Sequence, residues 1–289
     1  MAGGEGRLGS TLRVLGLALI IALAASACSR VSLAYNWFFQ SALVDYVDDY
    51  SDLTRAQRRD LDQRIGEFVD WHRGEALPEY ANLLRDVDRM IAERELAPAD
   101  VLTVVQRGEV LYRDFVVQLL DRVSPTLLAL DERQLTYMAD AFAEENSEIE
   151  QRWSGSDTVD ERVSRIERAM RRWVGRLEDW QRDHIREFLQ TQQPVVEGRL
   201  TLRQHWQEAF LQQLRNARSA EQLSLELRPF FLDSQAFAEP EHRQQFEART
   251  GDFHAFTAEF VNELTPRQKQ RLSRQLQRFA DDFDKLASQ

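Results

Sequence analysis

Apolar residues recur at every third or fourth position along most of this chain, and this period limits its fold more than any other feature. One clear stripe lies near the C-terminus with alternating spacings of four and three: Leu272, Leu276, Phe279, Phe283 and Leu286. Such a stripe is typical of a helix packed against neighbours. Glycine and proline are scarce, at 12 and 7 of 289 residues, and no segment alternates with period two for long enough to predict a sheet. Long helices with short connections are therefore favoured.

Helix-breaking residues divide the chain into segments. They lie at Gly74 to Pro78, Ala97-Pro98, Ser124-Pro125, residues 154–156, Gln193-Pro194, Arg228-Pro229, Pro240 and Thr265-Pro266. With these seams, the pattern predicts an all-α fold of about nine mostly antiparallel helices, packed as one or two bundles. We expect a helical domain over residues 35–289, with a soft division near residues 153–157.

Residues 1–27 have the architecture of a secretory signal peptide. Arg7 and Arg13 precede an apolar run over residues 15–24, which is shorter than the roughly 20 residues that a membrane-spanning helix needs. Small residues, Ala25-Ser26-Ala27, then precede the only cysteine, Cys28. This site resembles the lipobox of bacterial lipoproteins, although Ala25 stands where the lipobox usually has leucine. We expect cleavage after Ala27 and acylation of Cys28, including palmitate; soluble periplasmic export is the alternative.

The residues after Cys28 predict where the protein is held. Residues 28–34 form a short lipidated tether, and Ser29 follows the cysteine where an aspartate would resemble an inner-membrane retention signal. By that resemblance the protein is sorted to the periplasmic face of the outer membrane. Loss of the signal peptide leaves 35 basic and 47 acidic residues. This acidic balance argues against nucleic acid as a partner and against adsorption to anionic lipid by charge alone.

A helix-start motif occurs four times. Leu53-Thr54-x-x-Gln57 and Leu264-Thr265-x-x-Gln268 are the strict copies, and Leu130-Asp131-x-x-Gln134 and Leu177-Glu178-x-x-Gln181 are looser. A threonine or aspartate N-cap with glutamine three residues later predicts a capping box, in which each side chain bonds to the other's free backbone N–H. Glu178 is a poor cap, so the fourth copy is interpreted as chance. The intervals are unequal, so the motif is not a solenoid repeat.

Two resemblances involve these residues. The paired Leu-Thr-x-x-Gln motifs, at Thr54/Gln57 and Thr265/Gln268, resemble the signature of the Spy and CpxP periplasmic chaperones, small helical proteins that bind unfolded clients. Cys28, residues 33–37, residues 46–50 and residues 71–80 together resemble an uncharacterised family of Gram-negative lipoproteins, catalogued as a domain of unknown function. The second resemblance is strongest over residues 28–90 and implies a lipoprotein without implying an activity.

Aromatic residues close to Cys28 form a candidate interface. Tyr35, Trp37, Phe38 and Phe39 begin seven residues after the cysteine, and aromatic side chains favour the membrane interface. With Trp71 they form a candidate site for a client or for the bilayer. The alternative, which we favour for the segment after Cys28, is that these residues belong to the core of the first helix.

Two polar clusters are candidates for catalysis or metal binding. Asp45, Asp48, Asp49 and Asp52 form a dense carboxylate run without the spacing of a calcium loop, and a solvated helix end is favoured. His72 beside Glu75 suggests a general base, but no nucleophile motif, phosphate loop or paired histidine ligands accompany it. One cysteine excludes an internal disulfide. We therefore expect a non-enzymatic protein with no catalytic residue, cofactor or metal.

These observations favour a binding role. We expect a lipoprotein attached to the outer membrane through the lipid on Cys28, whose helical body binds envelope proteins through grooves between helices, as a chaperone or in assembly. Sixteen phenylalanines and six tryptophans are enough to supply an exposed apolar groove. The alternative is a carrier of a lipid or another apolar small molecule in a pocket between helices.

Overall fold

A computed structural model describes residues 31–153, 158–191, 199–233 and 240–289 of the chain. These residues form the helices α2 (Val31–Ser51), α3 (Arg55–Trp71), α4 (Leu77–Glu93), α5 (Pro98–Leu128), α6 (Glu132–Trp153), α7 (Val159–Met170), α8 (Asp179–Thr191), α9 (Arg199–Asn216), α10 (Ala220–Leu232), α11 (Pro240–Asn262) and α12 (Pro266–Ala287). A π-helical segment, η2 (His72–Ala76), joins α3 to α4. The described residues contain no strand, and the predicted all-α fold is confirmed.

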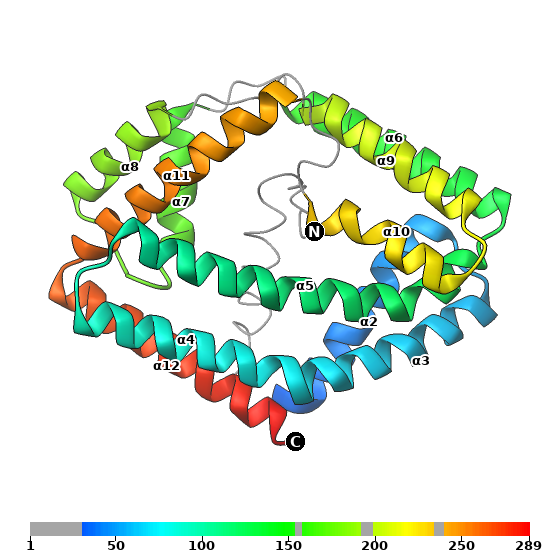
Figure 1. Cartoon of the computed structure of the whole chain (residues 1–289), viewed down its shortest axis with the longest axis horizontal. Coiled ribbons are helices and arrows are strands. Elements are labelled where there is room, and N and C mark those ends of the chain that lie inside the picture. Colours follow the sequence, from blue (N-terminus) through cyan, green and yellow to red (C-terminus); the bar gives the residue numbers. More distant parts are fainter. Residues whose placement is uncertain (1–30, 154–157, 192–198, 234–239) are drawn as a thin grey trace.

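The helices follow a ring-like outline with α5 as its longest element (Figure 1). Helix α5 packs against α3, α4, α10 and α11, so it joins elements from both ends of the chain. Helices α4 and α12 lie side by side and run antiparallel: Arg85 of α4 pairs with Asp284 near the end of α12 at 2.5 Å, and Gln277 donates to Asp88 at 2.8 Å. None of the described helices is both long and apolar enough to cross a membrane.

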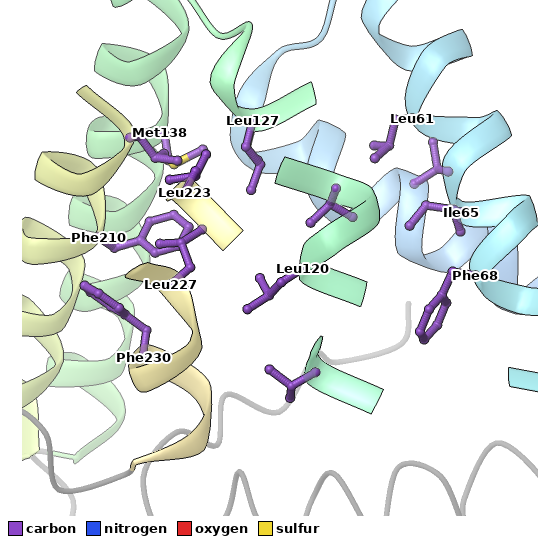
Figure 2. Close-up of a cluster of buried hydrophobic side chains, with 14 of the residues drawn as sticks. Leu61, Ile65, Phe68, Leu120, Leu127, Met138, Phe210, Leu223, Leu227 and Phe230 are labelled. Carbon is purple, nitrogen blue, oxygen red and sulfur yellow. The ribbon is translucent and has the colours of Figure 1, made fainter. Parts of the chain in front are cut away.

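Buried apolar side chains form three clusters. The largest joins α2, α3, α5, α6, α9 and α10, and Figure 2 shows its members Phe68, Leu120 and Leu227 projecting from α3, α5 and α10. A second cluster joins η2, α4 and α12, and a third joins α7, α8 and α11. Helices α9 and α10, which follow the expected soft division, therefore share a core with α2 and α3, which precede it. Residues 154–157 of that division lie outside the described residues.

Three of the expected seams are not helix ends. Pro125 and Pro229 lie inside α5 and α10. Each lies in the last turn of its helix, which ends three residues later; the proline removes the hydrogen bond to the carbonyl four residues earlier but does not end the helix where it stands. The seam from Gly74 to Pro78 is continuous π- and α-helix, because Leu77 donates to the carbonyl of His72 and the helix accommodates the proline near its new start. Pro98 and Pro266, by contrast, begin α5 and α12 as predicted.

The first and third copies of the helix-start motif bind each other. Thr54 and Gln57 form the predicted capping box, and Asp131 with Gln134 forms another. The two glutamine amides then exchange hydrogen bonds of 3.1 and 3.0 Å across 77 residues of sequence. Gln57 also donates to the Ala129 carbonyl at 2.9 Å, just before its partner's motif. The starts of α3 and α6 are therefore joined through paired side chains.

The second and fourth copies repeat this arrangement between α12 and α8. Gln181 and Gln268 exchange hydrogen bonds of 2.9 and 2.8 Å, and both side chains are buried. Gln268 completes a capping box with Thr265, and Gln181 accepts from the backbone N–H of Glu178 at 2.9 Å. The interpretation of the fourth copy as chance was wrong: Glu178 caps poorly, but Gln181 accepts from the backbone N–H at the start of its own motif and exchanges hydrogen bonds with a partner glutamine, as Gln57 and Gln134 do.

We predict that each glutamine pair is energetically coupled. Replacing Gln57 or Gln134 with alanine leaves its partner amide poorly paired in the core, so the double variant should lose about 1–2 kcal/mol less than the sum of the single losses. The cycle is measured by urea unfolding, and the same coupling is expected for Gln181 and Gln268. Gln63→Ala, on an exposed position of α3, is the control and should change stability by less than about 0.5 kcal/mol. Additive losses would show that the paired amides act independently.

Candidate functional site

The first turns of α2, the η2 segment and the C-terminal end of α12 meet at one end of the molecule, here called the α2 end (Figure 1). A chain of ring contacts joins them. The Phe39 ring lies 5.4 Å from the His72 ring, His72 lies 5.4 Å from Tyr80, and Tyr80 lies 6.1 Å from Phe283. Helix α2 is thereby fixed to helices that are distant in sequence.

The predicted aromatic interface is only partly described. Cys28 and Ala27 lie outside the described residues, and so do the side chains of Tyr35, Trp37 and Phe38, whose backbone belongs to α2. Phe39 is 6% exposed and belongs to the largest core cluster. For Phe39, the interpretation as a core residue is confirmed and the interface interpretation is wrong, because its ring packs against Phe68 and His72.

Trp71 is half-buried and packs between the first and second core clusters. Its ring centroid lies 5.8 Å from that of Phe68. The indole therefore joins two parts of the core at the end of α3. Only part of the Trp71 side chain is exposed and available to a client or to the bilayer.

His72 lies inside an aromatic enclosure. The rings of Phe39, Phe68, Tyr80 and Phe115 all have centroids within 6 Å of its imidazole. Burial disfavours the charged imidazolium and lowers the pKa of His72 to about 3. A ligand in solution would have to open the core to reach this imidazole, so the geometry does not favour His72 as a general base.

The other polar members of this cluster lie on the outside. Arg73 pairs with Asp70 at 3.0 Å, one turn earlier, and Glu75 is exposed. The π-helical turn places His72 in the core while leaving Gly74 and Glu75 in solvent. Histidine and glutamate, close in sequence, thus point into different environments.

The acidic run at the end of α2 is ion-paired to other helices. Arg58 of α3 binds the carboxylates of Asp45 and Asp48. Arg133 of α6 binds that of Asp52 at 2.5 Å. The described residues contain no group of acidic, histidine or cysteine side chains arranged to hold a metal ion. The acidic run was expected to be a solvated helix end. Part of it is an inter-helix contact instead, in which Arg58 and Arg133 neutralise three of its four carboxylates.

A polar network that sequence patterns do not indicate links α2, α6 and α9. The Tyr50 hydroxyl donates to Glu145 at 2.8 Å, and Arg203 donates to the same carboxylate at 2.5 Å and to Asn146 at 2.7 Å. Burial and the neighbouring carboxylate raise the pKa of the Tyr50 hydroxyl. Since Tyr50 and Glu145 are 95 residues apart, no local motif connects them. The network orients the three helices, and its two charged groups, Glu145 and Arg203, pair with each other.

One hollow lies between the end of α4 and the start of α12. Its volume is about 410 Å³, and its lining includes Asp88, Glu93, Arg94, Glu95 and Lys269. A cavity for a lipid chain would be lined by apolar side chains. The charges of this hollow therefore do not suit the alternative role as a carrier of apolar molecules.

The buried imidazole predicts a pH dependence of stability. The unfolded chain binds a proton near pH 6.5, whereas folded His72 binds one only near pH 3. Its contribution is therefore complete above about pH 6.5 and decreases as the pH falls toward 3, by about 2 kcal/mol at pH 5. We predict that His72→Leu lowers stability at pH 7 but reduces the loss of stability between pH 7 and pH 5 by about that amount, measured by urea unfolding at both pH values.

His205→Gln is the matched control for this prediction, because His205 is exposed on α9. The control should keep the pH dependence of the wild type. An unchanged loss of stability in His72→Leu between the two pH values would contradict the burial argument.

Comparisons with known proteins add one match. The model of a Family of unknown function (DUF6279) matches residues 49–243, which is more than half of the chain. No curated protein and no solved structure matches. The predicted resemblance to an uncharacterised family is thus confirmed, while the resemblance to the Spy and CpxP chaperones stays a prediction that rests on the two motifs.

Proposed function

This chain belongs to the Family of unknown function (DUF6279), and we propose that it is a lipoprotein of the outer membrane whose helical body binds envelope proteins in the periplasm, in a chaperone-like or assembly role. The proposal includes removal of residues 1–27, acylation of Cys28, and attachment to the membrane through that lipid. It assigns no catalytic step.

The position of α2 relative to Cys28 is the observation that carries the proposal. The helix begins at Val31, three residues after the cysteine, and its side chains Phe39 and Val44 are 6% and 2% exposed. A lipid on Cys28 would therefore be joined by very few residues to a helix that is packed into the main core. Such a short connection would hold the α2 end against the bilayer and direct the rest of the body toward the periplasm.

The surface of the described residues favours a macromolecular partner. Large apolar side chains that are at least 39% exposed occur on several helices: Tyr46, Leu102, Val110, Tyr137, Trp180, Leu225 and Phe253. Exposed tyrosine and tryptophan side chains, such as Tyr46, Tyr137 and Trp180, are common anchors at protein interfaces. They support protein binding as the role of the helical body.

We predict that Cys28→Ala releases the protein from the membrane. The native protein should gain the mass of three acyl chains and sediment with outer membranes, whereas the variant should remain soluble in the periplasm; intact mass and membrane fractionation measure both. The control is Ser51→Ala, a change 23 residues after Cys28 in the sequence, and its cell fractions should resemble those of the native protein. An unmodified Cys28 at the N-terminus of a soluble native protein would contradict the anchor.

We also predict that the mature protein slows the aggregation of a chemically denatured model enzyme. Exposed apolar side chains should hold the unfolded client, so light scattering should decrease as the protein is added up to several-fold molar excess. Replacing Trp180 and Phe253 with serine should weaken this effect, whereas replacing the exposed polar residues Gln63 and Gln270 with serine should not. Unchanged aggregation at several-fold excess would contradict the chaperone-like role.

A further inference from the structure

Two segments reverse the acidic character of the chain. Residues 264–280 contain five basic residues and no acidic one, and residues 168–177 contain four arginines and no acidic residue. The whole chain has a net charge of −11. A local excess of positive charge in an acidic protein attracts anionic groups to that place alone.

Four arginines of the first segment share one face of α12. Arg267, Arg271, Arg274 and Arg278 are separated by four, three and four residues, and all four are exposed. Because side chains three and four positions apart lie above one another on a helix, these arginines form a single row. The row extends over about 16 Å at a rise of 1.5 Å per residue.

The second basic segment, which joins α7 to α8, lies directly along this row. The Arg271 side chain donates to the Arg172 carbonyl at 3.4 Å, and Gln268 donates to the Arg176 carbonyl at 3.0 Å. The Arg172 guanidinium lies 5.1 Å from the centre of the Phe279 ring. Gly175 forms the turn with φ of 88°, a left-handed backbone conformation that favours glycine, and the position of its absent Cβ lies 3.4 Å from the Arg271 side chain. The two segments therefore form one surface.

Several cations of this surface remain available. Within the described residues, no carboxylate lies within ion-pairing distance of Arg176, Arg267 or Arg274, and the Arg271 side chain bonds to a backbone carbonyl. Trp180 adds an aromatic group: it is 45% exposed and precedes Gln181, which binds Gln268 of α12. Arginine and tryptophan are the residues most enriched among the energetically dominant positions of protein interfaces.

Acidic residues bound the surface on two sides. Asp281, Asp282 and Asp284 follow on α12, and Asp88 and Glu93 belong to the neighbouring α4. An extended anionic plane such as a lipid bilayer would meet these carboxylates as well as the arginines. A narrow anionic segment would meet the arginines alone, so the arrangement of charge favours a segment over a membrane surface.

We propose that the arginine row of α12, with Arg172, Arg176 and Trp180 beside it, binds an acidic segment of a partner protein. The inference deepens the proposed function by naming the chemistry of the partner. Guanidinium groups bind carboxylates through two parallel hydrogen bonds, and a helix with glutamates spaced by four and three residues would match the row.

The test uses the full mature protein and two fluorescein-labelled alanine-rich peptides. One carries glutamates at positions i, i+4, i+7 and i+11, and the other carries glutamines there. Fluorescence anisotropy should show tighter binding of the glutamate peptide, weakening as salt is added. The double variant Arg267→Gln/Arg274→Gln should weaken that binding by about tenfold. The matched control, Arg55→Gln/Arg59→Gln, removes two exposed arginines from α3 and should leave the binding within about twofold.

Three results would overturn the proposal. Equal binding of both peptides, or equal loss in both variants, would show that the row has no specific role. Arginine-dependent binding to phosphatidylglycerol vesicles without peptide binding would assign the row to lipid. Self-association of the wild type that the Arg267/Arg274 variant lacks would assign it to a second copy of the chain. The aggregation of the denatured model enzyme is measured in parallel, because it tests the proposed function and not the acidic partner. If the protein suppresses aggregation but does not bind the glutamate peptide, the proposed function stands and only the acidic partner is rejected.

Discussion

The reciprocal hydrogen bonds between paired glutamine amides determine which helix starts meet in this protein, and three of the four glutamines, Gln134, Gln181 and Gln268, are buried. An amide in the core loses its bonds to water and must recover them from protein groups. Gln134 and Gln268 each recover them from a partner glutamine, a capping backbone N–H and the carbonyl that precedes the partner's motif. One residue type therefore caps the start of its own helix and aligns that helix with another.

These pairs occur in separate parts of the molecule. The first joins α3 to α6 beside the largest core cluster, and the second joins α8 to α12 beside the third. Helix α5 and the antiparallel pair of α4 and α12 connect the two regions. The result is a body built from local helix pairs whose ends are specified by polar contacts and whose faces are held by apolar packing.

Charge is distributed in the same local way. The acidic end of α2 is bound by Arg58 and Arg133, and Glu145 is bound by Arg203, so the charges of those clusters are paired between helices. The row from Arg267 to Arg278 is exposed and bounded by aspartates. Within the row, Arg278 lies 4.0 Å from Asp282, whereas Arg267 and Arg274 have no carboxylate within ion-pairing distance among the described residues. These two arginines can therefore recognise a partner through charge.

Several features were predictable because they depend on neighbours in sequence. The apolar period specified helices, Thr54 and Thr265 specified helix starts with their glutamines, and Pro98 and Pro266 marked first turns. Pro125, Pro229 and Gly74 misled the prediction because the effect of a breaker depends on its place in the helix and on the packing around it. The spacing of the α12 arginines was also readable from the sequence, although the turn that lies beside them was not.

The sequence by itself determined the helical class, the capping boxes and the acidic balance, since each follows from residues within a few positions of one another or from composition. Only the tertiary structure decided that Phe39 and His72 are core residues, that the four motifs bind in pairs, and that two basic segments form one surface. The two residues in each of these contacts are between 33 and 99 positions apart in the sequence. Such contacts depend on how whole helices pack, and no local pattern encodes that choice.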